Sequence, residues 1–242
     1  MYHPFSIAET TIAAWNIFRK NFVTIIVYSV ISFALLFIFG LIVELLIPAD
    51  SFWWQTAGSF IVLFTQAYTT LGLYKLIFTV IDSEYYEFEF SQVLPAFRMI
   101  ISYLVVVFVG AFLITNLHFL LVRLNNYPNI QGLIQAIATI IGLYLALRVM
   151  FFITFIVDDY SGALESVKQS FQLTRGYILK VIVMLLIIIL LIAVPASLSL
   201  IYPIVSITII FTYPFVNIIL AVTYRKLVYS HQDVDDDIAE TD

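Results

Sequence analysis

The sequence predicts an all-α, polytopic membrane protein with six transmembrane helices. Of its 242 residues, 62% are hydrophobic and only 11% are charged, whereas an average soluble domain is about 45–50% apolar and about 25% charged. A soluble fold of this length cannot hide so much apolar surface, because its outer surface needs polar groups. Long uninterrupted apolar runs favour helices over barrel strands, since each helix satisfies its own backbone hydrogen bonds in lipid.

Six stretches have the length that a membrane span requires. A bilayer core of about 30 Å takes roughly 20 apolar residues of helix. The predicted spans cover residues 22–47, 56–81, 100–121, 130–157, 178–200 and 205–227. They form one membrane domain, residues 1–230, in which we expect the helices to pack as a compact bundle. The acidic tail over residues 231–242 is expected to be cytoplasmic and disordered.

Short connections separate the two spans of each successive pair. Pro48 ends the first span, residues 125–129 (Asn-Asn-Tyr-Pro-Asn) divide the third from the fourth, and Pro203 turns between the fifth and sixth. Trp53 and Trp54 suit the aromatic belt at the membrane interface. The spans are therefore expected to form three helical hairpins.

The distribution of basic residues predicts the orientation. Ten of the eleven Lys and Arg residues lie in or near the N-terminal, even-numbered and C-terminal connecting segments, and Arg123 alone lies on the other side. Basic residues are enriched on the cytoplasmic side of membrane proteins. Both termini are therefore predicted to be cytoplasmic.

A segment shaped as an amphipathic helix precedes each odd-numbered span. The first covers residues 6–20, the second and least regular covers residues 90–98, and the third covers residues 161–176. Apolar side chains recur at helical spacing on one face of the first and third, and Gly176 suits a left-handed C-terminal cap. Such helices lie in the headgroup plane.

The first and third segments match at an offset of 156 residues. The matched pairs are Glu9 with Glu165, Trp15 with Phe171, and Arg19 with Arg175. One interpretation is a threefold repeat of an interfacial helix followed by a two-helix hairpin. The alternative is convergence, because any cytoplasmic amphipathic helix favours an N-terminal cap, apolar anchors and terminal cations.

The junction between the fourth and fifth spans carries a resemblance to a known family. The residues concerned are Leu147-Arg148, Asp158-Asp159, Ala163-Leu164-Glu165, Ser170-Phe171 and Leu173-Thr174-Arg175-Gly176. This pattern resembles a group of bacterial six-helix membrane proteins that includes the membrane domain joined to some glycerophosphodiester phosphodiesterases. The resemblance implies a module of the bacterial cytoplasmic (inner) membrane, concerned with envelope or membrane homeostasis. No catalytic domain accompanies it in this chain, so phosphodiesterase activity is not implied.

Four charged residues around that junction are candidates for lipid or ligand contact. Ionisable residues inside a membrane are costly and are therefore functional candidates. Arg148 stands roughly 13 Å inside the predicted cytoplasmic boundary. We expect it to pair with Asp158, Asp159 or another carboxylate, or to bind a lipid phosphate through its planar guanidinium. Arg175 lies at the end of the third interfacial segment. The alternative for Arg148 is a snorkelling or structural clamp.

Five further polar residues fall within or at the ends of the spans and are candidates for a polar path. They are Glu44, Gln66, Asn116, His118 and Asn217. Glu44 is more easily explained as a hydrated carboxylate near the interface. Single amides and imidazoles also serve as hydrogen-bonding contacts between helices, typically worth about 1 kcal/mol or less.

Two functional hypotheses lead, and a third class, a lipid-modifying enzyme, would require Asp158, Asp159 and Glu165 to converge at the headgroup level. The absence of cysteines excludes thiolate metal sites and disulfides, the usual metalloprotease, serine hydrolase and phosphate-loop motifs are missing, and no basic stripe favours nucleic acid. We therefore predict a non-enzymatic module without cofactor or metal that binds membrane lipids, a protein partner or a second copy of itself. The alternative is a small transporter or channel.

Overall fold

The computed structural model describes residues 6–48, 51–82 and 90–239, and every regular element in these ranges is a helix. The elements are α1 (Ile7–Lys20), α2 (Phe22–Leu46), α3 (Phe52–Asp82), η1 (Phe90–Val93), α4 (Phe97–Arg123), α5 (Pro128–Val149), α6 (Phe152–Asp158), α7 (Ala163–Leu173), α8 (Ile178–Ser199), η2 (Pro203–Thr208) and α9 (Ile209–Ala239). Six helical segments are long and apolar enough to cross a membrane. The prediction of an all-α polytopic membrane protein is confirmed.

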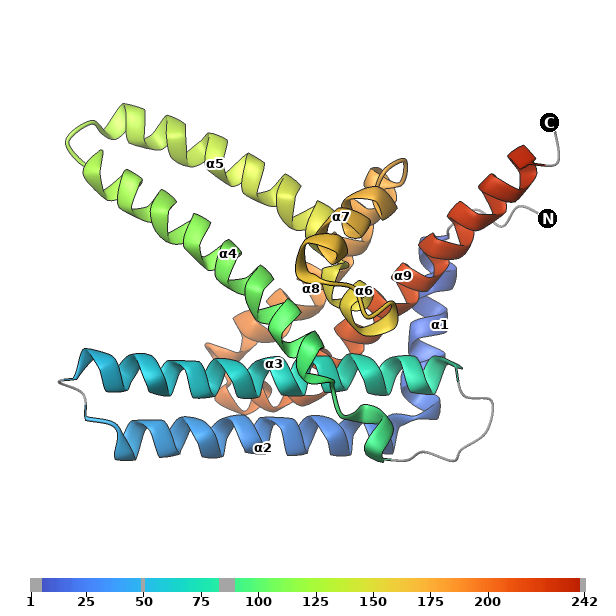
Figure 1. Ribbon diagram of the computed structural model, residues 1–242, viewed down its shortest axis with the longest axis horizontal. Helices are drawn as coiled ribbons and strands as arrows, with labels where there is room; N and C mark the ends of the chain where they lie inside the picture. Colours follow the sequence, from blue (N-terminus) through green and yellow to red (C-terminus); the bar gives the residue numbers. More distant parts are fainter. Residues whose placement is uncertain (1–5, 49–50, 83–89, 240–242) are drawn as a thin grey trace.

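Three antiparallel hairpins make up the molecule: α2–α3, α4–α5 and α8–α9. Their turns, near Ser51, Asn125 and Tyr202, point in one direction, and the two chain termini lie at the opposite end (Figure 1). We call the end with the three turns the distal end. The end with α1, α6, α7 and the C-terminal half of α9 is the basal end.

The hydrophobic core is concentrated toward the basal end. Its buried residues come mainly from the second half of α3 and the middle of α9, and others come from the start of α4, α6 and α8. Tyr74, Phe151 and Tyr224 are among its largest fully buried side chains. Tyr224 meets the Phe155 ring edge-on at 4.9 Å between centroids, an arrangement that the ring quadrupoles favour.

The distal halves of the hairpins separate from one another. In Figure 1 the α4–α5 hairpin diverges from the α2–α3 hairpin toward the distal end. No residue of α5 is buried, and the buried residues of α4 are confined to its beginning, between Met99 and Tyr103. The predicted compact bundle is therefore wrong for the distal half. Lipid satisfies an apolar side chain as well as a neighbouring helix does, so apolarity alone does not predict lateral packing.

Two predicted spans are interrupted. The fourth is divided at Met150 and Phe151 into α5 and α6, and the sixth begins with the 3₁₀ helix η2. At its other end α9 continues to Ala239, so residues 231–239 are helical where the sequence predicts a disordered tail. No Pro or Gly lies in that stretch, so a helix that is already nucleated can propagate through it.

Two of the three predicted interfacial segments are α-helices. α1 lies across the direction of α2 and α3 (Figure 1). α7 ends at Leu173, and Gly176 adopts the left-handed conformation with φ +87°. This agrees with the predicted C-terminal cap, because glycine has no Cβ and adopts positive φ readily. The middle segment contains only the four-residue η1 before α4 begins at Phe97. Its predicted helix is wrong, since Pro95 removes a backbone donor and disfavours helix at Leu94.

Candidate functional site

Arg148 lies in the last turn of α5, where it faces the C-terminal end of α7. Its Nη1 donates a hydrogen bond to the Thr174 hydroxyl at 2.8 Å, and its guanidinium stands over the Phe171 ring at 5.0 Å and the Tyr144 ring at 6.0 Å. Its buried Nε has no hydrogen-bond partner, and no carboxylate of the described residues pairs with it. The predicted pairing with Asp158 or Asp159 is therefore wrong. The Arg148 guanidinium therefore has a hydroxyl and two aromatic rings as neighbours but no anionic partner among the described residues.

Ser170 fixes the position of α7 against the break between α5 and α6. Its buried hydroxyl donates to the Arg148 carbonyl at 2.7 Å and accepts from the Phe151 amide at 3.2 Å. The regular helix is interrupted at this break, and Phe151 and Ser170 are fully buried. One side chain therefore satisfies a buried donor and a buried acceptor at the break. The hydroxyl thereby holds the Arg148 turn beside Thr174.

Further cationic groups follow directly after Thr174. Arg175 is exposed in the turn that leads into α8, and the Lys180 ammonium lies 5.8 Å from the centre of the Tyr177 ring in the first turn of that helix. The first amides of any α-helix have no acceptor within the helix, and they carry a partial positive charge. The cationic residues of this part of the fold are thus Arg148 in the last turn of α5, Arg175 in the α7–α8 turn and Lys180 in the first turn of α8.

A separate ion-pair cluster ties the basal ends of three hairpins together. Arg225 of α9 contacts Asp82 at the end of α3 at 2.7 Å and Asp158 at the end of α6 at 2.9 Å. The Tyr224 hydroxyl donates to Asp158 at 2.9 Å, and the Phe78 ring lies 5.0 Å from the Arg225 guanidinium. Asp158 is thus committed to a structural contact. We call Asp82, Asp158, Tyr224 and Arg225 the basal clamp.

Asp159 lies beside this clamp without an ion pair among the described residues. Partial burial raises the pKa of its carboxyl above the ordinary value of 3.8, and the neighbouring Asp158 carboxylate raises the pKa further, while Arg225 lowers it. Tyr160, the next residue, has φ +55°, which is unusual for a residue other than glycine. The α6–α7 turn therefore carries both electrostatic and backbone strain.

The five candidates for a polar path do not come together. Glu44 is exposed near the distal end of α2, and Asn116 and His118 are exposed on the distal half of α4. Asn217 is buried and donates to the Tyr213 carbonyl at 2.7 Å. Within the described part of the chain, no hydrogen bond, ion pair or ring contact joins any two of the five.

The remaining candidate, Gln66, is exposed on α3 and is one of the residues that line a pocket rich in hydroxyl groups. The pocket has a volume of about 150 Å³ and lies between α2, α3 and the start of α9. Its polar side chains are Tyr28, Ser29, Ser32, Gln66, Thr69, Thr70 and Tyr213. The Thr70 and Tyr213 hydroxyls are 3.3 Å apart, and the Tyr28 hydroxyl donates to the Thr69 carbonyl at 3.0 Å. We call this the hydroxyl pocket.

No family model, curated protein or solved structure matches the chain. The interpretation of the site therefore depends on its own geometry. Among the described residues, no group of three or more His, Cys, Asp and Glu side chains is arranged to hold a metal ion.

The roles of several of these residues cannot be read from the sequence. Arg225 is only one of the basic residues that indicate orientation, and nothing local marks Thr174 as the partner of Arg148. One signal for the pocket is present in the sequence: Tyr28, Ser29 and Ser32 recur at one-turn spacing in an apolar span, as do Gln66, Thr69 and Thr70 in the next. Residues three and four apart share a helix face, so two polar faces on consecutive spans predict a polar contact between them.

Proposed function

We propose that the protein is a non-enzymatic integral membrane module that binds anionic lipid at the basal end, with Arg148 as the principal contact. The main support for this proposal is the environment of the Arg148 guanidinium. Its buried Nε has no hydrogen-bond partner, and no carboxylate of the described residues forms an ion pair with it. A charge in this environment is costly unless it is paired. A lipid phosphate supplies the missing anion and can accept two parallel hydrogen bonds from a guanidinium.

The surroundings of Arg148 support an anion rather than a neutral ligand. Arg175 and the N-terminal amides of α8 follow within a few residues of Thr174, so several positive groups can share one headgroup. The apolar, exposed surfaces of α5 and α8 adjoin this position and suit acyl chains.

We further propose that the basal end faces the cytoplasm and that α1 and α7 are amphipathic helices in the headgroup layer. The distribution of Lys and Arg supports this orientation. The crosswise path of α1 in Figure 1 suits a helix in the plane of the membrane. Placement in the bacterial inner membrane, with a role in envelope homeostasis, follows from the family resemblance.

Native mass spectrometry of the detergent-released protein tests this function. Wild type is expected to retain phosphatidylglycerol or cardiolipin, and Arg148→Ala is expected to bind these lipids about tenfold more weakly or worse, because a charge-assisted hydrogen bond is worth about 1.5–3 kcal/mol. Arg123→Ala, which removes an exposed arginine at the distal end of α4, is the matched control and should retain them. The same spectra report any bound subunit.

A second variant separates lipid binding from a packing role. Thr174→Val removes the hydrogen bond to Arg148 but keeps the guanidinium. It should lower the unfolding midpoint while leaving most of the bound anionic lipid in place. If lipid loss instead follows the loss of stability in both variants, Arg148 is a structural clamp and the proposed function is wrong.

A further inference from the structure

The hydroxyl pocket differs from the Arg148 region in both chemistry and depth. All its polar side chains are uncharged, and they come from the N-terminal half of α2, the middle of α3 and α9 near Tyr213. Gln66 is 14 residues from the distal start of α3 and 16 from its basal end. The pocket therefore lies near the middle of the span rather than at the interface.

The pocket has unused hydrogen-bonding capacity. The Gln66 carboxamide lines it and makes no side-chain hydrogen bond to the described residues. Thr70 and Tyr213 share one hydrogen bond, which uses one of their two hydroxyl protons and leaves the other as a donor. An unsatisfied amide in hydrocarbon is costly, so a ligand that accepts and donates hydrogen bonds here is stabilised.

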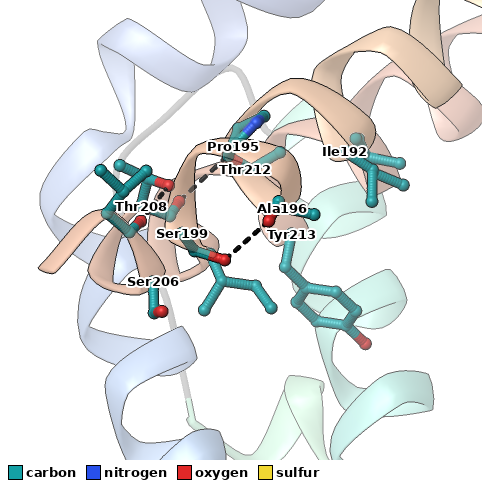
Figure 2. Close-up of a pocket in the computed structure, with 11 residues that line it drawn as sticks. Ile192, Pro195, Ala196, Ser199, Ser206, Thr208, Thr212 and Tyr213 are labelled. Carbon is teal, nitrogen blue, oxygen red and sulfur yellow. Dashed lines mark hydrogen bonds between the residues drawn. The ribbon is translucent and has the colours of Figure 1, made fainter. Parts of the chain in front are cut away.

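Apolar grooves adjoin the pocket on two sides. Thr69 also lines a groove of about 540 Å³ formed by α2, α3 and Leu104 of α4, whose walls include Phe39, Phe60 and Phe64. Tyr213 also lines a pocket of about 300 Å³ formed by the distal end of α8, η2 and α9. Figure 2 shows the Tyr213 hydroxyl pointing away from Pro195 and Ser199 of that second cavity.

Together these features define a polar site between two apolar channels. We propose that the hydroxyl pocket binds an uncharged lipid whose head carries carbonyl or hydroxyl oxygens, with its hydrocarbon chain in an adjoining groove. A phosphate has no cationic partner among the residues that line the pocket, so a charged headgroup bears its full desolvation cost there. Two classes of lipid share this chemistry: diacylglycerols, with a hydroxyl and two ester carbonyls, and isoprenoid quinones, with two ring carbonyls.

This site extends the proposed lipid binding to a second head group, and it depends on none of the residues around Arg148. The two proposals can therefore fail separately. Arg148→Ala is expected to lose anionic lipid and to keep the neutral lipid.

The test is photocrosslinking in phosphatidylcholine nanodiscs with a diazirine-bearing diacylglycerol and, in a second arm, a diazirine-bearing menaquinone. The proposal expects peptides of α2, α3 or α9 to be labelled by at least one probe. Excess unlabelled lipid of the same class should compete, and excess phosphatidic acid with the same chains should not.

Near-isosteric variants decide whether the hydroxyls matter. Thr70→Val and Tyr213→Phe remove the paired hydroxyls while preserving most of the side-chain volume, and we expect each to reduce specific labelling at least fivefold. Thr139→Val is the control, because the Thr139 hydroxyl is exposed on α5 and bonds within its own helix. Thermal unfolding confirms that each variant is folded.

A third variant, Gln66→Leu, removes the unpartnered amide without opening a cavity and should also lower labelling. Loss in the diacylglycerol arm alone, or in the quinone arm alone, identifies the source of the ligand. Labelling that is equal in wild type and in all three pocket variants, labelling that phosphatidic acid displaces, or no specific labelling by either probe would overturn the proposal.

Discussion

The basal and distal halves of the molecule differ in both charge and packing: most charged residues lie on basal segments, whereas Glu44 and Arg123 lie near the distal turns. The basal half contains the buried core and the basal clamp, which join different hairpins, and the Ser170 contact, which joins α7 to the end of α5. In the distal half the α4–α5 hairpin projects without a buried residue in α5. The hairpins are therefore held together where buried apolar packing is combined with polar and ionic contacts at defined positions. The distal surfaces are left open to lipid.

Matched leucine truncations measure this difference most strongly. Leu71, in the core part of α3, is fully buried, whereas Leu143 of α5 is 56% exposed. Leu71→Ala should lower the free energy of unfolding by about 2–5 kcal/mol through lost contacts and a cavity. Leu143→Ala should change it by no more than about 0.5 kcal/mol. Chemical unfolding in mixed micelles provides the measurement, and comparable losses in both variants would remove the distinction between the two halves.

Breaking the basal clamp is the next largest expected effect. Arg225→Ala leaves Asp158 unpaired; in the wild type the Arg225 side chain is 23% exposed and the Asp158 side chain 17%. We expect the free energy of unfolding to fall by about 2–3 kcal/mol. This is less than the loss of a fully buried pair costs, because the site is partly solvated. Lys226→Ala is the control, since its contact to Glu9 is 3.6 Å and largely exposed, and it should cost at most about 1 kcal/mol.

Much of this division could not be predicted from the sequence. Span length, hairpin turns and the Gly176 cap are local properties, and they are readable from apolar runs, prolines and glycine. The partner of Asp158 is 67 residues away in α9, and the sequence offers the nearer Arg148 as an equally suitable cation. Lateral packing is also not encoded in hydropathy, because lipid and protein satisfy apolar side chains alike.

Glycine substitutions sharpen the comparison within single helices. A Cβ at Gly72 of α3 would collide with the Tyr28 hydroxyl and approach the Val93 carbonyl at 3.3 Å, whereas a Cβ at Gly142 of α5 meets nothing within 4 Å. Gly72→Ala should destabilise the protein by about 1–3 kcal/mol. Gly142→Ala should be neutral or slightly stabilising, because alanine favours the helix by up to about 1 kcal/mol. Thermal unfolding of both variants is the check, and an unaffected Gly72→Ala protein would contradict the close approach of α2 and α3.

The smallest expected effect concerns the pH dependence at Asp159. Its raised pKa means that the folded protein binds this proton more tightly than the unfolded chain does. The carboxyl therefore lowers stability as the pH rises from about 4 through its raised pKa. Asp159→Asn should raise the unfolding midpoint slightly at pH 7, and the gain should disappear near pH 4. Asp82→Asn, which weakens a contact to Arg225, should instead lower the midpoint at pH 7.

The separation of the hairpin tips tests the central claim most directly. The chain has no cysteine, so spin labels can be attached specifically at Ser51→Cys and Asn126→Cys. These positions lie on the turns of the α2–α3 and α4–α5 hairpins. Pulsed electron paramagnetic resonance in nanodiscs then measures the distance between the two labels. Packed helices lie about 8–10 Å apart, so a compact bundle would keep these tips within about 20 Å. The splayed arrangement predicts a distance distribution centred well beyond 20 Å. A narrow distribution below that distance would show that the distal halves close together, and it would contradict the division between a packed basal half and an open distal half.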